Sequence, residues 1–270
     1  MANTKLNILP LPTFGQLGVN YAERDIEGFE TEEIYISPHD EQTVLQYIVS
    51  DSCTELHIGA NAKAKLVQVF EKNTRVASKL NASVADNAEF ELIQLYIGGE
   101  DTVSEINTEL DGRRSAFKTY IGYSLGEEEK LDINLVAVHK GKKSTSDIAV
   151  RGVLSDKAQK TFKGTIDFKN GSAGAKGAEQ EEVLLMNESV RNKTVPVILC
   201  AEEDVEGSHG ATIGRLDDRH IFYMKSRGIP EDKIYELMAR SKLMQIIEKI
   251  DDEQAKKRIF AALEWGDEYE

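Results

Sequence analysis

The stretch Phe162-Lys-Gly-Thr-Ile-Asp-Phe168 alternates apolar or small residues with polar ones, which puts Phe162, Ile166 and Phe168 on one face. Successive side chains of a β-strand point to opposite faces, so this run predicts a strand with one buried and one wet face. Similar short runs, separated by clusters of Gly, Asn, Asp, Ser and Lys, fill the chain from about residue 43 to residue 214. They are 43–49, 66–70, 90–97, 117–123, 133–139, 146–153, 161–168, 183–186 and 195–200. The middle of the chain is therefore predicted to be mostly β.

Two architectures fit so many short strands: an antiparallel sandwich, or a β-solenoid in which each coil stacks on the one before it. Antiparallel hairpins favour tight Asn-Gly or Asp-Gly turns. The best such pairs, Asp111-Gly112 and Asn170-Gly171, lie in longer polar connections. This favours the solenoid, although no repeat consensus fixes its period.

A helical pattern follows residue 214. Asp217 is a natural N-cap for a helix that should run to about Arg227 and end at Gly228. Pro230 is expected at the first position of a second helix, and Asp251 at the start of a third. The apolar stripe of the second helix is Ile234, Leu237, Met238, Met244, Ile247 and Ile250. We therefore divide the chain into an acidic N-terminal segment (1–42), a β-core (43–214) and a C-terminal helical domain (215–270).

The 270-residue chain has 47 acidic and 33 basic residues, a formal charge of −14. A field of that sign repels phosphate backbones and anionic lipid, so neither nucleic acid nor a membrane surface is an expected partner. Residues 1–62 hold ten Asp or Glu but only Lys5 and Arg24. We expect this stretch to carry ordinary solubility charge, to form a solvated rim, or to be an arm that docks on a basic partner. No apolar run approaches the ~20 residues that cross a bilayer, and the first twenty residues do not resemble a secretory signal, so we expect a cytoplasmic protein.

Motifs for catalysis are missing. The sequence has no P-loop, His-Glu-x-x-His, Gly-x-Ser-x-Gly or Gly-x-Gly-x-x-Gly string, so we expect no ATP hydrolysis and no enzyme of these classes. Cys53 and Cys200 are too few and too distant for a zinc motif or for the roughly four thiolates that hold an iron–sulfur cluster. Both are expected to be small buried residues within strands.

His209 lies in Gly207-Ser-His-Gly-Ala-Thr-Ile-Gly214, a run of small residues. Two interpretations remain open at this point. The small neighbours leave the imidazole free to meet a ligand or a partner surface, or the glycines simply turn the chain at the last coil. His220 is expected on the surface of the helix that follows.

Residues 184–229, LLMNESVRNKTVPVILCAEEDVEGSHGATIGRLDDRHIFYMKSRGI, closely resemble the signature of the SufB/SufD family of iron–sulfur cluster assembly proteins, the SufD side best. Upstream, residues 146–153, Thr161-Phe-Lys-Gly-Thr-Ile166 and Ala178-Glu-Gln180 are similar to further family elements. The resemblance implies a right-handed parallel β-helix with flanking helices. It also implies a non-catalytic subunit of the SUF machinery that binds the SufC ATPase, an ABC-type protein, through its C-terminal helices. Its β-helix end would pair with SufB or with a second copy of itself, through residues 183–186 and 195–200.

The resemblance also assigns roles to residues. It makes His209 a candidate ligand or proton-handling group for a nascent iron–sulfur cluster at the dimer interface, with no stably bound cofactor. Many SufD proteins have Cys two positions before this His, whereas this chain has Gly207, so direct sulfur chemistry is not expected. The expected SufC contacts are Phe222, Tyr223, Arg227, Ile234, Leu237 and Met238.

Two other functions compete with the scaffold. One is a purely structural homodimeric adaptor for the ATPase, without iron or sulfur chemistry, which the missing thiols favour. The other is a polysaccharide-acting β-helix enzyme, which would call for an export signal. If the tail is an independent binding domain, deleting it after Gly214 should leave the β-core folded.

Overall fold

The computed structural model describes residues 2–13, 15–71 and 75–263. Within them the chain forms sixteen strands, one short 3-10 helix and three α-helices. The strands are β1 (Ala2–Leu6), β2 (Ala22–Ile26), β3 (Glu30–Ile36), β4 (Glu41–Ile48), β5 (Ser52–Ile58), β6 (Lys63–Phe70), β7 (Ala77–Val84), β8 (Glu89–Ile97), β9 (Asp101–Leu110), β10 (Ala116–Leu125), β11 (Lys130–His139), β12 (Thr145–Leu154), β13 (Gln159–Phe168), β14 (Ala175–Leu185), β15 (Arg191–Cys200) and β16 (Val205–Gly214). The helices are η1 (Gly15–Leu17), α1 (Asp218–Ser226), α2 (Glu231–Ile247) and α3 (Glu253–Ala262).

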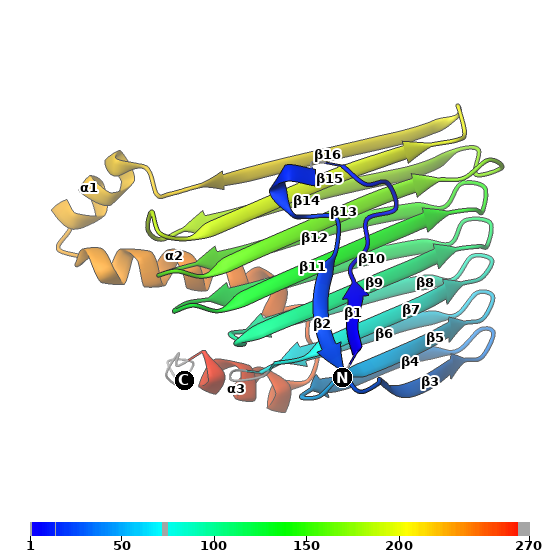
Figure 1. Cartoon of the computed structure of the whole chain (residues 1–270), viewed down its shortest axis with the longest axis horizontal. Coiled ribbons are helices and arrows are strands. Elements are labelled where there is room, and N and C mark those ends of the chain that lie inside the picture. Colours follow the sequence, from blue (N-terminus) through cyan, green and yellow to red (C-terminus); the bar gives the residue numbers. More distant parts are fainter. Residues whose placement is uncertain (1, 14, 72–74, 264–270) are drawn as a thin grey trace.

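Strands β3 to β16 build a parallel β-solenoid (Figure 1). The even-numbered strands form one seven-stranded sheet, from β4 to β16, and the odd-numbered strands form the other, from β3 to β15. Each coil adds one strand to each sheet, and each strand up to β14 pairs in parallel with the equivalent strand of the next coil. The solenoid expected from the sequence is confirmed, and the antiparallel sandwich is excluded.

The length of a coil grows along the chain, which explains why no fixed repeat is visible. In the first coils Glu30 pairs with Ser52, and Ser52 pairs with Ser78. Near the other end Gln159 pairs with Arg191, a wider separation in sequence than either of the early pairs. Backbone pairing keeps the strands in register while the coils lengthen, so structural equivalence persists without a constant sequence period.

The inward-facing side chains of both sheets form one continuous core. Because equivalent strands are in register, like side chains stack above one another. The rings of Phe90 and Phe117 lie 5.2 Å apart, and those of Phe70 and Tyr96 lie 4.3 Å apart. Burying each such aromatic side chain contributes roughly 1.5–3 kcal/mol.

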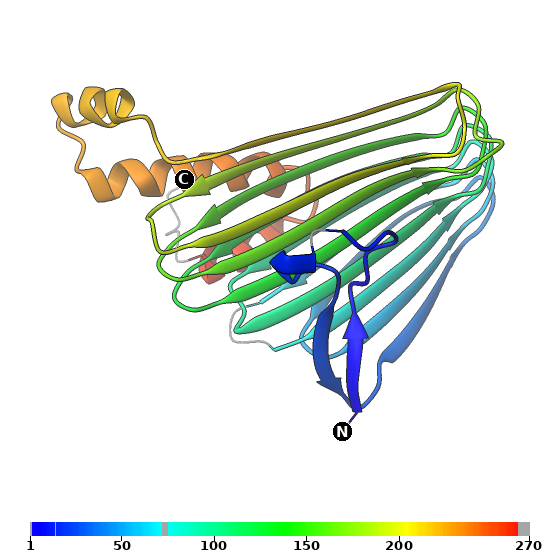
Figure 2. The same cartoon turned by 45° about the horizontal axis from the view of Figure 1, so that its top comes forward.

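Helices α2 and α3 cover the outer face of the even-numbered sheet (Figure 2). Leu243, Ile246 and Ile259 are buried against Val67 and Leu95, which point away from the coil interior. Deleting the tail after Gly214 would expose this apolar surface to water. That the β-core stays folded without the tail remains a prediction, and this packing opposes it.

The three helices predicted from the sequence are present, and the first residues of two of them differ by one position from the prediction. Asp217 caps α1, its side chain accepting a hydrogen bond from the backbone N–H of Arg219. Pro230 is the N-cap of α2 rather than its first helical residue. The N-cap of α3 is Asp252 and not Asp251, because the Asp252 carboxylate accepts hydrogen bonds from two backbone N–H groups of the first turn.

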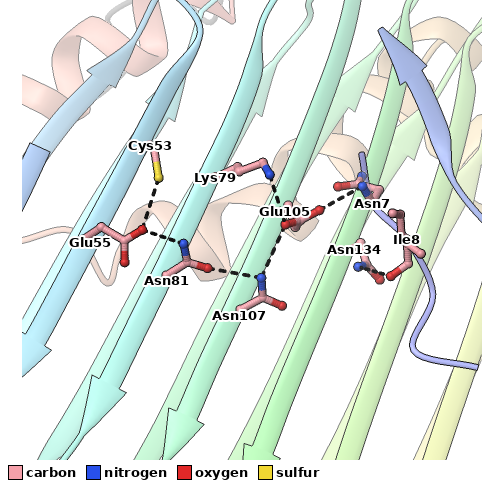
Figure 3. Close-up of polar contacts among 9 residues, drawn as sticks. All are labelled: Asn7, Ile8, Cys53, Glu55, Lys79, Asn81, Glu105, Asn107 and Asn134. Atoms are coloured by element: carbon pink, nitrogen blue, oxygen red, sulfur yellow. Dashed lines mark hydrogen bonds and ion pairs between the residues drawn. The ribbon is translucent and has the colours of Figure 1, made fainter. Parts of the chain in front are cut away.

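The N-terminal segment folds back onto its own solenoid. The β1–β2 hairpin lies across the odd-numbered sheet (Figures 1 and 3), where Arg24 pairs with Asp101 at 2.7 Å. The backbone N–H of Asn7 donates to Glu105, and Lys163 donates to the Asn7 carbonyl. Of the three roles expected for residues 1–62, a free partner-binding arm is wrong for the β1–β2 hairpin because it docks on the solenoid, and ordinary solubility charge is not tested. The solenoid also begins at Glu30, with β3, rather than at residue 43.

Candidate functional site

The late end of the solenoid is open. Strands β15 and β16 are the last of their sheets, so each has a strand neighbour on one side only. Almost every residue of β16 is exposed, whereas the equivalent strands of inner coils alternate between buried and exposed positions. An edge of this kind leaves a row of backbone N–H and C=O groups without partners in the sheet.

His209 lies on β16, so the glycine-rich run is a strand and not a turn. A side-chain carbon at Gly207 would lie 3.0 Å from Phe168 and 3.2 Å from Ile198, which pack in the coil interior. His209, two residues later, shares this inner face. Its ring is exposed because no further coil lies above it.

A buried ionic cluster lies inside the coil below this end. The Lys160 ammonium of β13 is ion-paired with Glu181 of β14, and neither side chain is accessible to solvent. Glu181 also accepts hydrogen bonds from Thr194 at 2.7 Å and from the Tyr123 hydroxyl at 3.4 Å. Burial lowers the pKa of Lys160 against the opposing effect of Glu181, and it raises the pKa of Tyr123.

Glu179 is the second buried carboxyl of β14. Only 5% of the residue is exposed, and burial raises its pKa to about 7, with a further contribution from nearby Glu181. The side chain reaches across the coil to β13, where a Cβ on Gly164 would lie 1.9 Å from one Glu179 oxygen. In the β14–β16 ladder, the residue paired with Glu179 is His209.

Sequence reasoning missed Glu179, Glu181 and Lys160, although the alternation along β14 carries a signal. Gly177, Glu179, Glu181 and Val183 are all buried, and the residues between them are exposed or half-buried. The buried positions alternate as those of an ordinary strand do. The sequence alone does not show that Glu179 and Glu181 point into the coil, on the same face as Val183.

The residues expected to contact SufC fall into two groups. Phe222 and Tyr223 of α1 are 75% and 57% exposed, and the Arg227 guanidinium lies 5.3 Å from the Tyr223 ring centre. Leu237 of α2 is also exposed, and Met238 is half-buried. Ile234 is only 1% exposed, so its assignment as a partner contact is wrong: it packs inward as part of the helix's buried stripe.

The two cysteines differ from each other. Cys53 is buried in β5, as expected, and burial raises the pKa of its thiol to about 11, with a hydrogen bond to Glu55 adding to the effect (Figure 3). Cys200 is exposed, so the expectation of burial is wrong there, because it is the last residue of a terminal strand. His220 is exposed on α1, as expected.

No group of three or more His, Cys, Asp or Glu side chains suited to a metal ion occurs among residues 2–13, 15–71 and 75–263. In the same part of the chain, no helix has the length and apolarity to cross a bilayer.

Comparison with known proteins gives one family. Residues 30–242 match the description "SUF system FeS cluster assembly, SufBD core domain", a span that starts with β3 and ends within α2. The chain belongs to the SufBD family. It is 28% identical over 237 residues to the iron–sulfur cluster assembly protein SufD of Bacillus subtilis. The aligned residues cover 86% of this chain and 53% of that relative. It is 24% identical over 233 residues to SufD of Escherichia coli, covering 83% and 55%.

Membership in the SufBD family confirms the resemblance that residues 184–229 carry. The chain spans about half the length of the curated SufD relatives it matches. What is shared is the SufBD core, the part that contains the solenoid and both the His209 strand and α1.

Proposed function

We propose that this SufBD protein is a scaffold subunit of the SUF machinery, without catalytic activity of its own, that assembles a transient iron–sulfur cluster in the cytoplasm. It binds a SufC-like ABC ATPase through α1 and the start of α2. It pairs through the open coil end with a SufB-like subunit or with a second copy of itself. The cluster forms where the covered coil end brings His209 against the partner.

The observation that carries the pairing is the open coil end. Both last strands have unpaired edges, and β16 is exposed along nearly its whole length. An edge left in this state invites pairing with another chain. A partner there would also cover His209, whose neutral imidazole is a competent ligand for iron.

The aromatic patch on α1 supports binding of an ATPase. Phe222 and Tyr223 expose large apolar surfaces, and Arg227 adds a cation beside them. Aromatic residues and Arg are enriched among the residues that dominate binding energy at protein interfaces. In Figure 2, α1 projects beyond the strands, where a partner has access to it.

A structural adaptor without iron chemistry is the second candidate. Gly207 replaces the motif Cys, and the described residues gather no three metal-binding side chains. Both observations favour an adaptor. In the scaffold account, the remaining ligands come from the partner or from sulfide.

The ATPase contact is tested by co-purification of the SufC-like protein with the full-length chain. Phe222→Ser and Tyr223→Ser should each weaken capture at least about tenfold, as expected for aromatic residues at the centre of an interface. Tyr35→Ser, on exposed β3 at the opposite end of the coil, is the matched control and should capture normally. Normal capture by both α1 variants would contradict the assignment.

A further inference from the structure

The early end of the solenoid, where β3 and β4 lie, is open as well (Figure 1). Strands β3 and β4 are the first of their sheets, so each has a strand neighbour on one side only. Between them lies a hollow of about 560 Å³, lined by residues of β3, β4 and the start of β5. Val49 beside the hollow is 59% exposed. Unpaired edges next to such a hollow can accept an added strand together with its side chains.

A chain of hydrogen bonds runs along the inside of the coil to this early end. The Tyr96 hydroxyl donates to Gln94 at 2.8 Å. Gln94 donates to Gln68 at 2.7 Å, and Gln68 donates to Gln46 at 2.8 Å. Gln46 in turn donates to the Glu32 carboxylate of β3 at 2.8 Å. A carboxylate can accept about four hydrogen bonds, so Glu32 ends the chain at the hollow with capacity for a donor from outside the coil.

The charge of the first coil decides which kind of strand fits there. Residues 30–51 contain six Asp or Glu and no Lys or Arg. Five of the six are exposed, namely Glu30, Glu32, Glu33, Asp40 and Glu41. Like charges on facing strands are destabilising, so the early ends of two copies of this chain repel each other. A basic segment is attracted to the same surface.

We propose that the early coil end binds an extended segment of a partner protein that is rich in Lys or Arg. The segment adds a strand to the free edge of β3, and one of its cations enters the hollow and pairs with Glu32. In strand addition of this kind, backbone hydrogen bonds supply affinity and alternate side chains supply specificity. The surface lies at the opposite end of the solenoid from β15 and β16, so it stays free when a subunit covers the late end.

Fluorescence anisotropy with a labelled octapeptide of alternating Lys and Val tests this binding on the full-length chain at low ionic strength. The peptide should bind, and its affinity should fall as salt is added because salt screens exposed charges. Glu32→Lys should weaken binding at least about tenfold, since it removes the carboxylate and sets a cation against the peptide. Glu206→Lys is the matched control, because it changes the net charge equally at an exposed position of β16. Its affinity should stay within about twofold of wild type.

Hydrogen exchange of the backbone amides locates the bound peptide. The amides of β3 should exchange more slowly in the complex than in the free chain. Equal affinities of Glu32→Lys and Glu206→Lys, or protection confined to other strands, would overturn the inference. A peptide that does not bind would overturn it too, and the acidic residues would then serve only to keep the edge from pairing. Protection of β3 that grows with protein concentration without peptide would assign this end to a second copy of the chain instead.

Discussion

Glu179 and Gly164 face each other across one coil, and neither residue is explained by its own strand. A glycine weakens a strand, and a glutamate opposes burial, yet together they place a carboxylate inside the solenoid. The two residues lie on consecutive strands that belong to different sheets. The pattern of one strand cannot show that these two residues meet, whereas His209 stands out in the sequence because it lies in a run of small residues within the family signature.

His139 gives the pH dependence of stability at the scale of one residue. It is fully buried between the hydroxyls of Ser144 and Ser146, and burial lowers its pKa to about 4. Below pH ~6.5 the imidazole becomes protonated in the unfolded chain, whereas in the folded chain it stays neutral until near pH 4. The free energy of unfolding therefore falls as pH falls through this window. Between pH ~7.5 and ~5 this contributes a loss on the order of 2 kcal/mol.

Urea unfolding at the two pH values checks this expectation. His139→Gln removes the titrating group. Between the two pH values its free energy of unfolding should therefore fall by about 2 kcal/mol less than that of the wild type. His220→Gln, at an exposed position, should fall as wild type does. If His139→Gln and wild type lose stability equally, the buried imidazole is not the cause.

Among the elements, the sequence runs fall on β4, β6, β8 and β10 to β15, whereas β5, β7 and β9 were missed although Leu56, Leu80 and Ile106 of these strands pack in the core. The run 117–123 lies within β10, and 133–139 lies within β11. Strand β16 was missed because its inner face meets no further coil and therefore needs no apolar side chains. β3 was missed because its exposed face is acidic, which suggested a solvated segment.

Gly152 tests how tightly adjacent strands stack. A Cβ at this position would lie 1.8 Å from the ring of Tyr123, which is fully buried on the neighbouring strand β10. Gly152→Ala should therefore lower the free energy of unfolding by about 1–3 kcal/mol, the usual cost of overpacking a core.

Gly210→Ala is its control, since a side-chain carbon there meets nothing within 4 Å. It should change the free energy of unfolding by no more than about 0.5 kcal/mol. Both variants are compared by urea denaturation. Equal free energies of unfolding for Gly152→Ala and Gly210→Ala would mean that the strands can move apart to admit a methyl group, contrary to the close stacking of Gly152 on Tyr123.

The whole molecule is a solenoid whose faces are covered unequally. The N-terminal hairpin covers part of the odd-numbered sheet, and α2 with α3 covers the even-numbered sheet. Sequence periodicity indicated the solenoid and the helical tail. It could not indicate that the tail completes the core, because apolar residues such as Val67 look the same whether they face the interior or a helix.

The open coil end is the feature on which the functional account depends. In the proposed function His209 is the ligand that one chain offers there, and a covering subunit or sulfide supplies the rest. Cluster assembly is therefore expected in the complex and not on the isolated chain.

Anaerobic reconstitution with iron and sulfide tests this most directly, with cluster content measured by visible absorption and bound iron. The full-length chain alone should retain no stable cluster. Its complex with the SufB-like subunit and the ATPase should assemble one, and His209→Ala should lower the yield several-fold while the complex stays intact. A His209→Ala complex that assembles clusters at the normal rate and yield would contradict the account and leave the protein a structural adaptor.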